Sequence, residues 1–152
     1  LFWFAVAGLP GAALYRFANT ADAMWGYPGE RDGRDWQWAG KWAARADDVL
    51  SWLPARLTAL LMCAAGGIVA RRALPLNARR TPSPNSGWPM AAMALVLNVR
   101  LAKPGVYVLN DGGQPAQQRH MERALRLSGR VVQILAATAL LTSLLLLWRA
   151  SP

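Results

Sequence analysis

The sequence has one cysteine, Cys63, and one histidine, His120, among its 152 residues. A single cysteine cannot form a disulfide within the chain, and these two side chains offer no zinc-binding cluster. Serine-protease-like triads, Walker phosphate loops and the dinucleotide-binding glycine motif are also absent, so no common catalytic signature identifies a reaction. We expect Cys63 to be a small buried apolar residue and His120 to lie on the surface.

Charge is also scarce, since only 16% of residues are charged and 54% are hydrophobic. Soluble domains are nearer one quarter charged. The net charge is nevertheless +9, and residues 49–152 contain twelve Lys or Arg against two Asp or Glu. Such an excess indicates nucleic acid, an anionic membrane face or anionic substrates. Because the arginines at 71–72 and at 126 and 130 flank apolar runs, the pattern favours a membrane and argues against nucleic acid.

Long apolar runs are the main positive signal. The uncharged run Val131–Trp148 is long enough for a membrane-spanning helix. Several arginines precede this run and one follows it, which predicts a cytoplasmic N-terminal side. Val49–Ala70 is a second candidate, in which we expect Pro54 to open the helix and Arg56 to lie near the membrane surface.

Two further apolar segments complete the expected fold. Trp88–Leu101 is short for a span, so we expect a buried, re-entrant or interfacial helix. The opening run Leu1–Leu9 lacks a basic leader and is expected to be the tail of a membrane segment. The predicted fold class is all-α: residues 1–152 form a single membrane domain within a polytopic helical bundle, with polar loops and a short re-entrant or interfacial helix.

Acidic residues cluster at two positions. Asn19 and Asp22 are three residues apart and share a face on a helix, where a carboxylate beside an amide suits Mg²⁺. A helix cap explains the same pair equally well. Asp47 and Asp48 point about 100° apart on a helix, so they need not share a site. Favourable acid at a helix start explains this pair better than a metal does.

Arg56 and the segment Thr81–Pro89 are candidates for anion binding. An arginine in an apolar segment needs a carboxylate, a phosphate or a route to the surface, so an anionic substrate or a partner from another helix is expected. The proline-rich segment leads into a helix whose first amides, with Ser83, Asn85 and Ser86 nearby, could receive a phosphate. An N-capping loop is the alternative.

Three strings together resemble a known family. They are Pro10–Tyr27, Asp47–Ala59 and Ser83–Leu101, and they occur in the family's order and with similar spacing. They look like the adenosylcobinamide-phosphate synthase family of cobalamin biosynthesis, over residues 8 to about 113. Members are about twice this length, so the chain resembles their C-terminal half. Met90 departs from the family, because many members have Glu there, which argues against an essential carboxylate at this position.

The resemblance implies an ATP-dependent amide ligase with several spans in the bacterial inner membrane. Such an enzyme joins the free propionate of adenosylcobyric acid to the amine of 1-amino-2-propanol phosphate, or of a related amino-alcohol phosphate. ATP and Mg²⁺ are the implied cofactors, and the lipid bilayer and other corrinoid-pathway membrane enzymes are the implied partners. The fragment alone is expected to be inactive.

Roles for individual residues follow from their chemistry, because phosphate transfer needs a metal and cations that hold anionic groups. As catalytic residues we predict Asp22, Asp48 and Arg56. The predicted metal ligands are Asp22, Asp47 and Asp48, and the predicted substrate-binding residues are Arg16, Asn19, Ser83, Asn85 and Ser86.

Two other functions fit the same sequence. One is a non-catalytic membrane signalling protein resembling AmpE, against which the intact strings at 19–22 and 83–89 argue. The other is a corrinoid transporter or scaffold, for which Arg56 and the short helix could line a path. Product formation from the three substrates separates both from the ligase.

Overall fold

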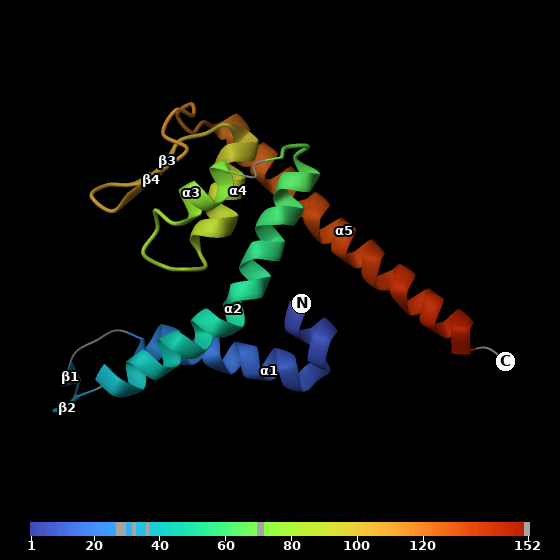
Figure 1. The fold of residues 1–152 in the computed structure, drawn as a ribbon, viewed down its shortest axis with the longest axis horizontal. Helices are drawn as coiled ribbons and strands as arrows, with labels where there is room; N and C mark the ends of the chain where they lie inside the picture. The colour runs from blue at the N-terminus through green and yellow to red at the C-terminus, as the bar shows by residue number, and fades with distance from the viewer. Residues whose placement is uncertain (27–29, 32, 36, 70–71, 151–152) are drawn as a thin grey trace. The chain divides into compact units, whose positions relative to one another are not determined.

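The computed structural model describes residues 1–26, 30–31, 33–35, 37–69 and 72–150, and these are mostly helical (Figure 1). The elements in order are α1 (Phe2–Trp25), β1 (Glu30–Arg31), β2 (Arg34–Asp35), α2 (Gln37–Ala65), α3 (Ala73–Ala78), α4 (Gly87–Leu97), β3 (Leu101–Lys103), β4 (Tyr107–Leu109) and α5 (Gln118–Ala150). The chain divides into two compact units, Leu1–Ala55 and Arg56–Pro152, with the boundary inside α2.

The helical character is confirmed, but the all-α prediction is wrong in one respect. Two antiparallel hairpins are present, β1 with β2 and β3 with β4. In the second, Leu101 pairs with Leu109 and Lys103 with Tyr107, and Gly105, at φ +71°, lies in the turn. Strands of two or three residues are too short to show an alternating pattern, which explains why they were not predicted.

Two helices are long and apolar enough to cross a membrane. Among the described residues they are Gly40–Ala65 and Gln118–Thr142, which overlap the two predicted spans. Within the second unit, α5 extends beyond the other elements (Figure 1), and every residue from Val132 to Thr142 is exposed. An apolar helix without protein cover suggests membrane association.

The prediction that Pro54 opens a helix is wrong, because Pro54 lies well inside α2. Proline has no N–H, so the carbonyl of Leu50 loses its usual helical partner. The indole Nε1 of Trp3 donates a hydrogen bond of 2.9 Å to that carbonyl oxygen. A kink at Gly8, which has φ +60°, separates the first turn of α1, with Trp3, from the rest of that helix. The indole thus replaces the hydrogen bond that the proline removes.

Replacing Trp3 with Phe should therefore destabilise the protein by about 1–2 kcal/mol, because the Leu50 carbonyl loses its donor. The same substitution should cost clearly less in a Pro54→Ala background, where residue 54 regains an N–H for that carbonyl. Denaturant unfolding in detergent of wild type, the two single variants and the double variant measures both costs. Equal costs in the two backgrounds would show that the indole acts through packing alone.

Helix α4 is the centre of the second unit. Ala91, Ala92 and Ala94 are fully buried, and the first two pack in a core that includes Ala59 and Cys63 of α2. Helix α4 is therefore packed against other parts of its unit, and the expected burial of Cys63 is confirmed. Helix α4 ends earlier than predicted, because Asn98 adopts the left-handed conformation that commonly terminates helices.

Asn110 connects the second hairpin to α3 and α4. Its backbone N–H donates to Asn77 Oδ1 over 2.8 Å. Its side-chain amide donates to the carbonyl oxygens of Ala94, at 3.1 Å, and Val99, at 3.2 Å. One residue therefore satisfies polar groups at α3, at the end of α4 and at the start of the hairpin.

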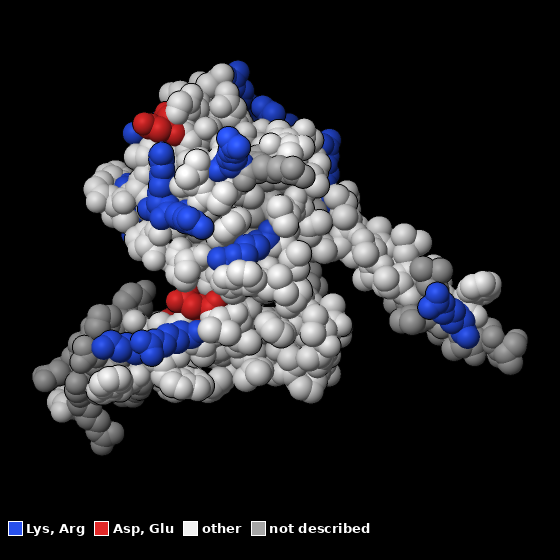
Figure 2. All heavy atoms as spheres, in the orientation of Figure 1, with Lys and Arg blue, Asp and Glu red and all other residues white. Residues whose placement is uncertain are grey.

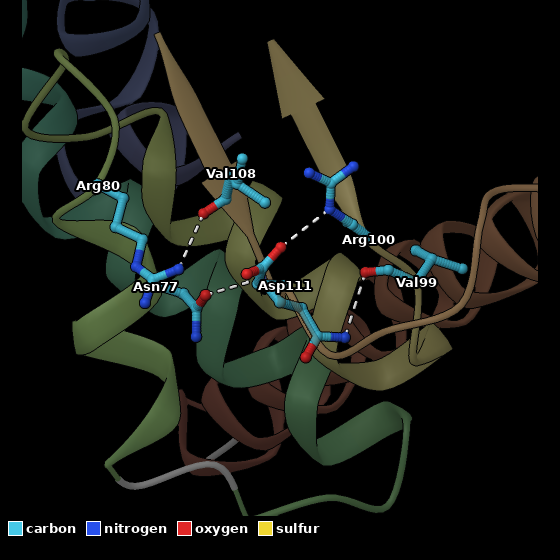
Figure 3. Close-up of polar contacts among 7 residues, drawn as sticks. Asn77, Arg80, Val99, Arg100, Val108 and Asp111 are labelled. Carbon is cyan, nitrogen blue, oxygen red and sulfur yellow. Dashed lines mark hydrogen bonds and ion pairs between the residues drawn. The ribbon is translucent and has the colours of Figure 1, made fainter. Parts of the chain in front are cut away.

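Two arginines add contacts at the hairpin (Figure 3). Arg80 donates to the carbonyl of Val108 in β4 over 3.1 Å, and Arg100 pairs with Asp111 at 3.0 Å across the two ends of the hairpin itself. The second pair is largely exposed, so its net contribution to stability is expected to be small.

The prediction of a surface position for His120 is wrong, because only 6% of the residue is exposed. The Nδ1 atom of His120 accepts a hydrogen bond of 3.0 Å from the backbone N–H of Gln117, and the backbone N–H of His120 donates to the Gln117 carbonyl. Leu127 and Val131 are buried further along the same face of α5. His120 therefore closes the first turn of α5 instead of facing solvent.

Candidate functional site

Polar side chains line the contact between α1 and α2 in the first unit. Asn19 donates to Asp47 Oδ1 over 3.3 Å, and the hydroxyl of Ser51 donates to the same oxygen over 3.4 Å. The hydroxyls of Tyr15 and Ser51 share a hydrogen bond of 3.2 Å. Positions 15, 19 and 22 repeat at helical spacing, which brings Asp22 onto the same face. We call Tyr15, Asn19, Asp22, Asp47 and Ser51 the α1–α2 polar cluster.

Asp22 lies close enough to Asp47 for the two carboxylates to interact. Burial, and secondly the negative charge of Asp47, raise the pKa of Asp22 above its ordinary value. Among the described residues no three His, Cys, Asp or Glu side chains converge as a metal-binding group. Mg²⁺ commonly binds one or two carboxylates and keeps water or phosphate in its other positions, so this set of oxygen donors fits it.

The raised pKa predicts how Asp22 affects folding. Below the ordinary aspartate pKa the Asp22 carboxyl is neutral in both the folded and the unfolded protein, and its contribution to folding stability is then fully present. This stability is lost as pH rises through the folded-state pKa, because the carboxyl must then ionise in its buried position. Asp22→Asn, which stays neutral, should thus stabilise the protein relative to wild type near pH 7 but not near pH 3.5. Thermal unfolding across this range, with Asp111→Asn as an exposed control, measures the difference. A gain that is independent of pH would contradict it.

The second cluster lies within the second unit, where Arg56 of α2 meets the start of α4. Its Nη1 donates to Asn85 Oδ1 over 3.1 Å, and its guanidinium carbon lies 4.7 Å from the ring centre of Trp88. Asn85 is buried, whereas Arg56 is partly exposed. A guanidinium stacked on an aromatic ring can still bind a carboxylate or phosphate through two parallel hydrogen bonds. We call Arg56, Asn85 and Trp88 the Arg56 corner.

The loop before α4 is closed on itself. Ser83 Oγ accepts hydrogen bonds from the backbone N–H groups of Asn85, at 3.3 Å, and Ser86, at 3.2 Å. The hydroxyl of Thr81 donates to the carbonyl of Ala78, at 3.1 Å, and also lies 3.0 Å from that of Ser83. Ser83 thus engages the amides of Asn85 and Ser86, which lie just before α4, and no side-chain hydrogen bond caps the helix at Ser86. The positive charge beside this loop comes from Arg56, which bonds to Asn85.

The structure brings some of the predicted residues together and not others. Asn19 and Asp22 meet Asp47, and Arg56 meets Asn85. Asp48 is partly buried one position further along α2, while Arg16 and Ser86 are exposed. The sequence interpretation missed Tyr15, Ser51 and Trp88, although the first two lie four residues from Asn19 and Asp47 and could have been found by helical spacing.

These features define a mostly helical protein with two helices that could cross a membrane and with separate acidic and basic polar clusters. The family model described as CobD/Cbib protein matches residues 1–128. The chain belongs to this family, which confirms the resemblance identified from the three strings.

Curated relatives carry the same family name. The chain is 46% identical over 134 residues to the probable cobalamin biosynthesis protein CobD of Methanothermobacter thermautotrophicus, covering 84% of this chain and 44% of the relative. It is 39% identical over 160 aligned residues to cobalamin biosynthesis protein CobD of Brucella melitensis, covering 94% of this chain and 48% of the relative. The chain thus spans slightly less than half the length of these relatives. No solved structure matches it.

Proposed function

We propose that the protein is an ATP-dependent amide ligase of cobalamin biosynthesis with several spans in the bacterial inner membrane. It joins the propionate of adenosylcobyric acid to the amine of 1-amino-2-propanol phosphate and gives adenosylcobinamide phosphate. The observation that carries this proposal is the Arg56 corner, where a cation in an apolar helix is held ready for an anion by Asn85 and Trp88. Membership of a family whose named members serve cobalamin biosynthesis supports it.

The proposed reaction has two steps. A propionate oxygen attacks the γ-phosphorus of ATP, the bond to the leaving ADP oxygen breaks, and an acyl phosphate forms. The amine then attacks the acyl carbon, inorganic phosphate leaves, the nitrogen loses a proton and the amide remains. Both steps place negative charge on phosphate or acyl oxygens, which preorganised cations stabilise.

The chain's own residues fit these requirements. Arg56 binds a carboxylate or phosphate oxygen, and Asn85 and Trp88 fix the direction of its guanidinium. Asp22 and Asp47, with Asn19, are proposed to hold Mg²⁺, which neutralises phosphate charge when bound. Asp48 is proposed as a third acidic ligand or catalytic group. Arg16, Ser83 and Ser86 are proposed substrate contacts, with Ser83 acting through the loop that it closes.

The test uses the protein as its gene encodes it, in nanodiscs, with adenosylcobyric acid, aminopropanol phosphate, ATP and Mg²⁺. Mass spectrometry should detect adenosylcobinamide phosphate and an equal amount of ADP, and neither should form when ATP or Mg²⁺ is omitted. If the folded protein gives no product with every substrate present, the ligase proposal fails. Uptake of the corrinoid into vesicles without ligation would then favour a transporter. The absence of both turnover and uptake would favour a signalling protein.

A further inference from the structure

Four arginines form an exposed row at the start of α5. They lie at positions 119, 123, 126 and 130, and steps of four, three and four residues place them on one face of a helix. All four are exposed. We call them the α5 arginine row. The row ends where the apolar segment begins at Val131. On the face shown in Figure 2, the projecting part of α5 carries blue Lys or Arg atoms only near its far end.

This row does not take part in the packing of α5. The buried face consists of His120, Leu127 and Val131, each one position after an arginine and hence about 100° round the helix. Among the described residues the row forms one ion pair, between Arg126 and Glu122 at 4.0 Å, and both side chains are more than half exposed. A pair of this kind contributes little to stability. Arg119 also donates an exposed hydrogen bond of 3.4 Å to the side-chain oxygen of Gln114. These exposed contacts contribute little, so the row is not needed to stabilise the fold.

The depth of each arginine identifies the ligand class. Along a helix, Arg130 lies about 1.5 Å and Arg126 about 7.5 Å before Val131, whereas Arg123 lies about 12 Å and Arg119 about 18 Å before it. The polar headgroup layer is about 5–7 Å thick on each side of the hydrocarbon core. With the apolar segment in the core, the two nearer arginines reach the phosphates of the lipid headgroups. The two farther ones stand beyond them.

We propose that Arg126 and Arg130 bind the phosphate groups of anionic phospholipids in the leaflet that α5 enters, and so fix the depth of this helix. The inference rests on the membrane placement proposed above. A guanidinium pairs with a phosphate through two parallel hydrogen bonds. The surrounding charge favours the same ligand, because residues 56–152 contain twelve basic residues and two acidic ones. Each arginine near an anionic membrane surface is expected to strengthen binding about fivefold.

Two double variants test this with matched loss of charge. The first combines Arg126→Gln with Arg130→Gln, and the second combines Arg119→Gln with Arg123→Gln. Each removes two charges from the same face of α5, but at a different depth. Native mass spectrometry in mixed micelles measures the affinity of the whole protein for phosphatidylglycerol relative to phosphatidylcholine. We expect the first pair to weaken the preference about 25-fold and the second less than about threefold. Arg126→Lys with Arg130→Lys, which keeps both charges, should retain most of it and covers any failure of the Gln pair to fold.

Several outcomes would overturn the inference. Equal losses in the two Gln pairs would show diffuse attraction instead of a site at headgroup depth, and no loss in either would show no site. Displacement of the lipid by inorganic phosphate or ATP would identify a site for a soluble anion. Alkaline carbonate extraction from phosphatidylcholine vesicles tests the membrane placement separately from the lipid site. Release of wild type would contradict membrane placement, whereas retention without phosphatidylglycerol preference would contradict only the lipid site.

Discussion

Arg56→Ala is expected to lower the rate of ligation at saturating substrate by about 100-fold or more, which is the usual effect of removing a group that stabilises transition-state charge. The guanidinium lies against the Trp88 ring and bonds to Asn85, so its direction is fixed before an anion arrives. Alanine removes both the charge and this arrangement. Arg56→Lys keeps the charge but cannot make two parallel hydrogen bonds from a planar group, so it should recover only part of the rate.

The measurement is the rate of adenosylcobinamide phosphate formation by the whole protein in nanodiscs. Arg79 is a suitable control, because it is an exposed arginine in the same unit, and Arg79→Ala should stay within about twofold of wild type. Circular dichroism and gel filtration establish that each variant is folded. A folded Arg56→Ala protein with nearly normal turnover would remove Arg56 from the proposed site and leave the ligase itself standing.

The sequence predicted contacts within one helix better than contacts between distant segments. The spacing of Asn19 and Asp22 correctly places both on one face of a helix, and that face meets Asp47. For Arg56 the sequence indicated only an anion or a partner from elsewhere. The partner is Asn85, 29 residues away, and its identity depends on how the loop before α4 folds.

The errors have the same physical origin. Pro54 was expected at a helix start because nothing nearby in the sequence shows that Trp3 will satisfy the Leu50 carbonyl. His120 was expected at the surface because its neighbours are Arg and Gln, yet tertiary packing buries it. Burial and compensating hydrogen bonds are properties of the packed chain, so local composition cannot reveal them.

The close approach of α3 and α4 leads to the second large prediction. Gly87 opens α4, and a Cβ atom there would overlap the carbonyl oxygen of Ala78 and the hydroxyl oxygen of Thr81. A backbone carbonyl cannot rotate away as a flexible side chain can, so α4 would have to shift from α3. The Thr81 hydroxyl, which bonds to the carbonyl of Ala78, would be displaced as well.

Gly87→Ala should therefore destabilise the protein by about 3 kcal/mol, at the upper end of the cost of overpacking. Gly129→Ala is the matched control, because a Cβ at this helical position in α5 meets no atom within 4 Å. It should be neutral or stabilising by up to about 1 kcal/mol, since alanine favours a helix more than glycine does. Denaturant unfolding in detergent compares the two. Similar stabilities would mean that the α3–α4 contact yields easily, and an intact ligation rate in Gly87→Ala would mean that the Arg56 corner does not depend on it.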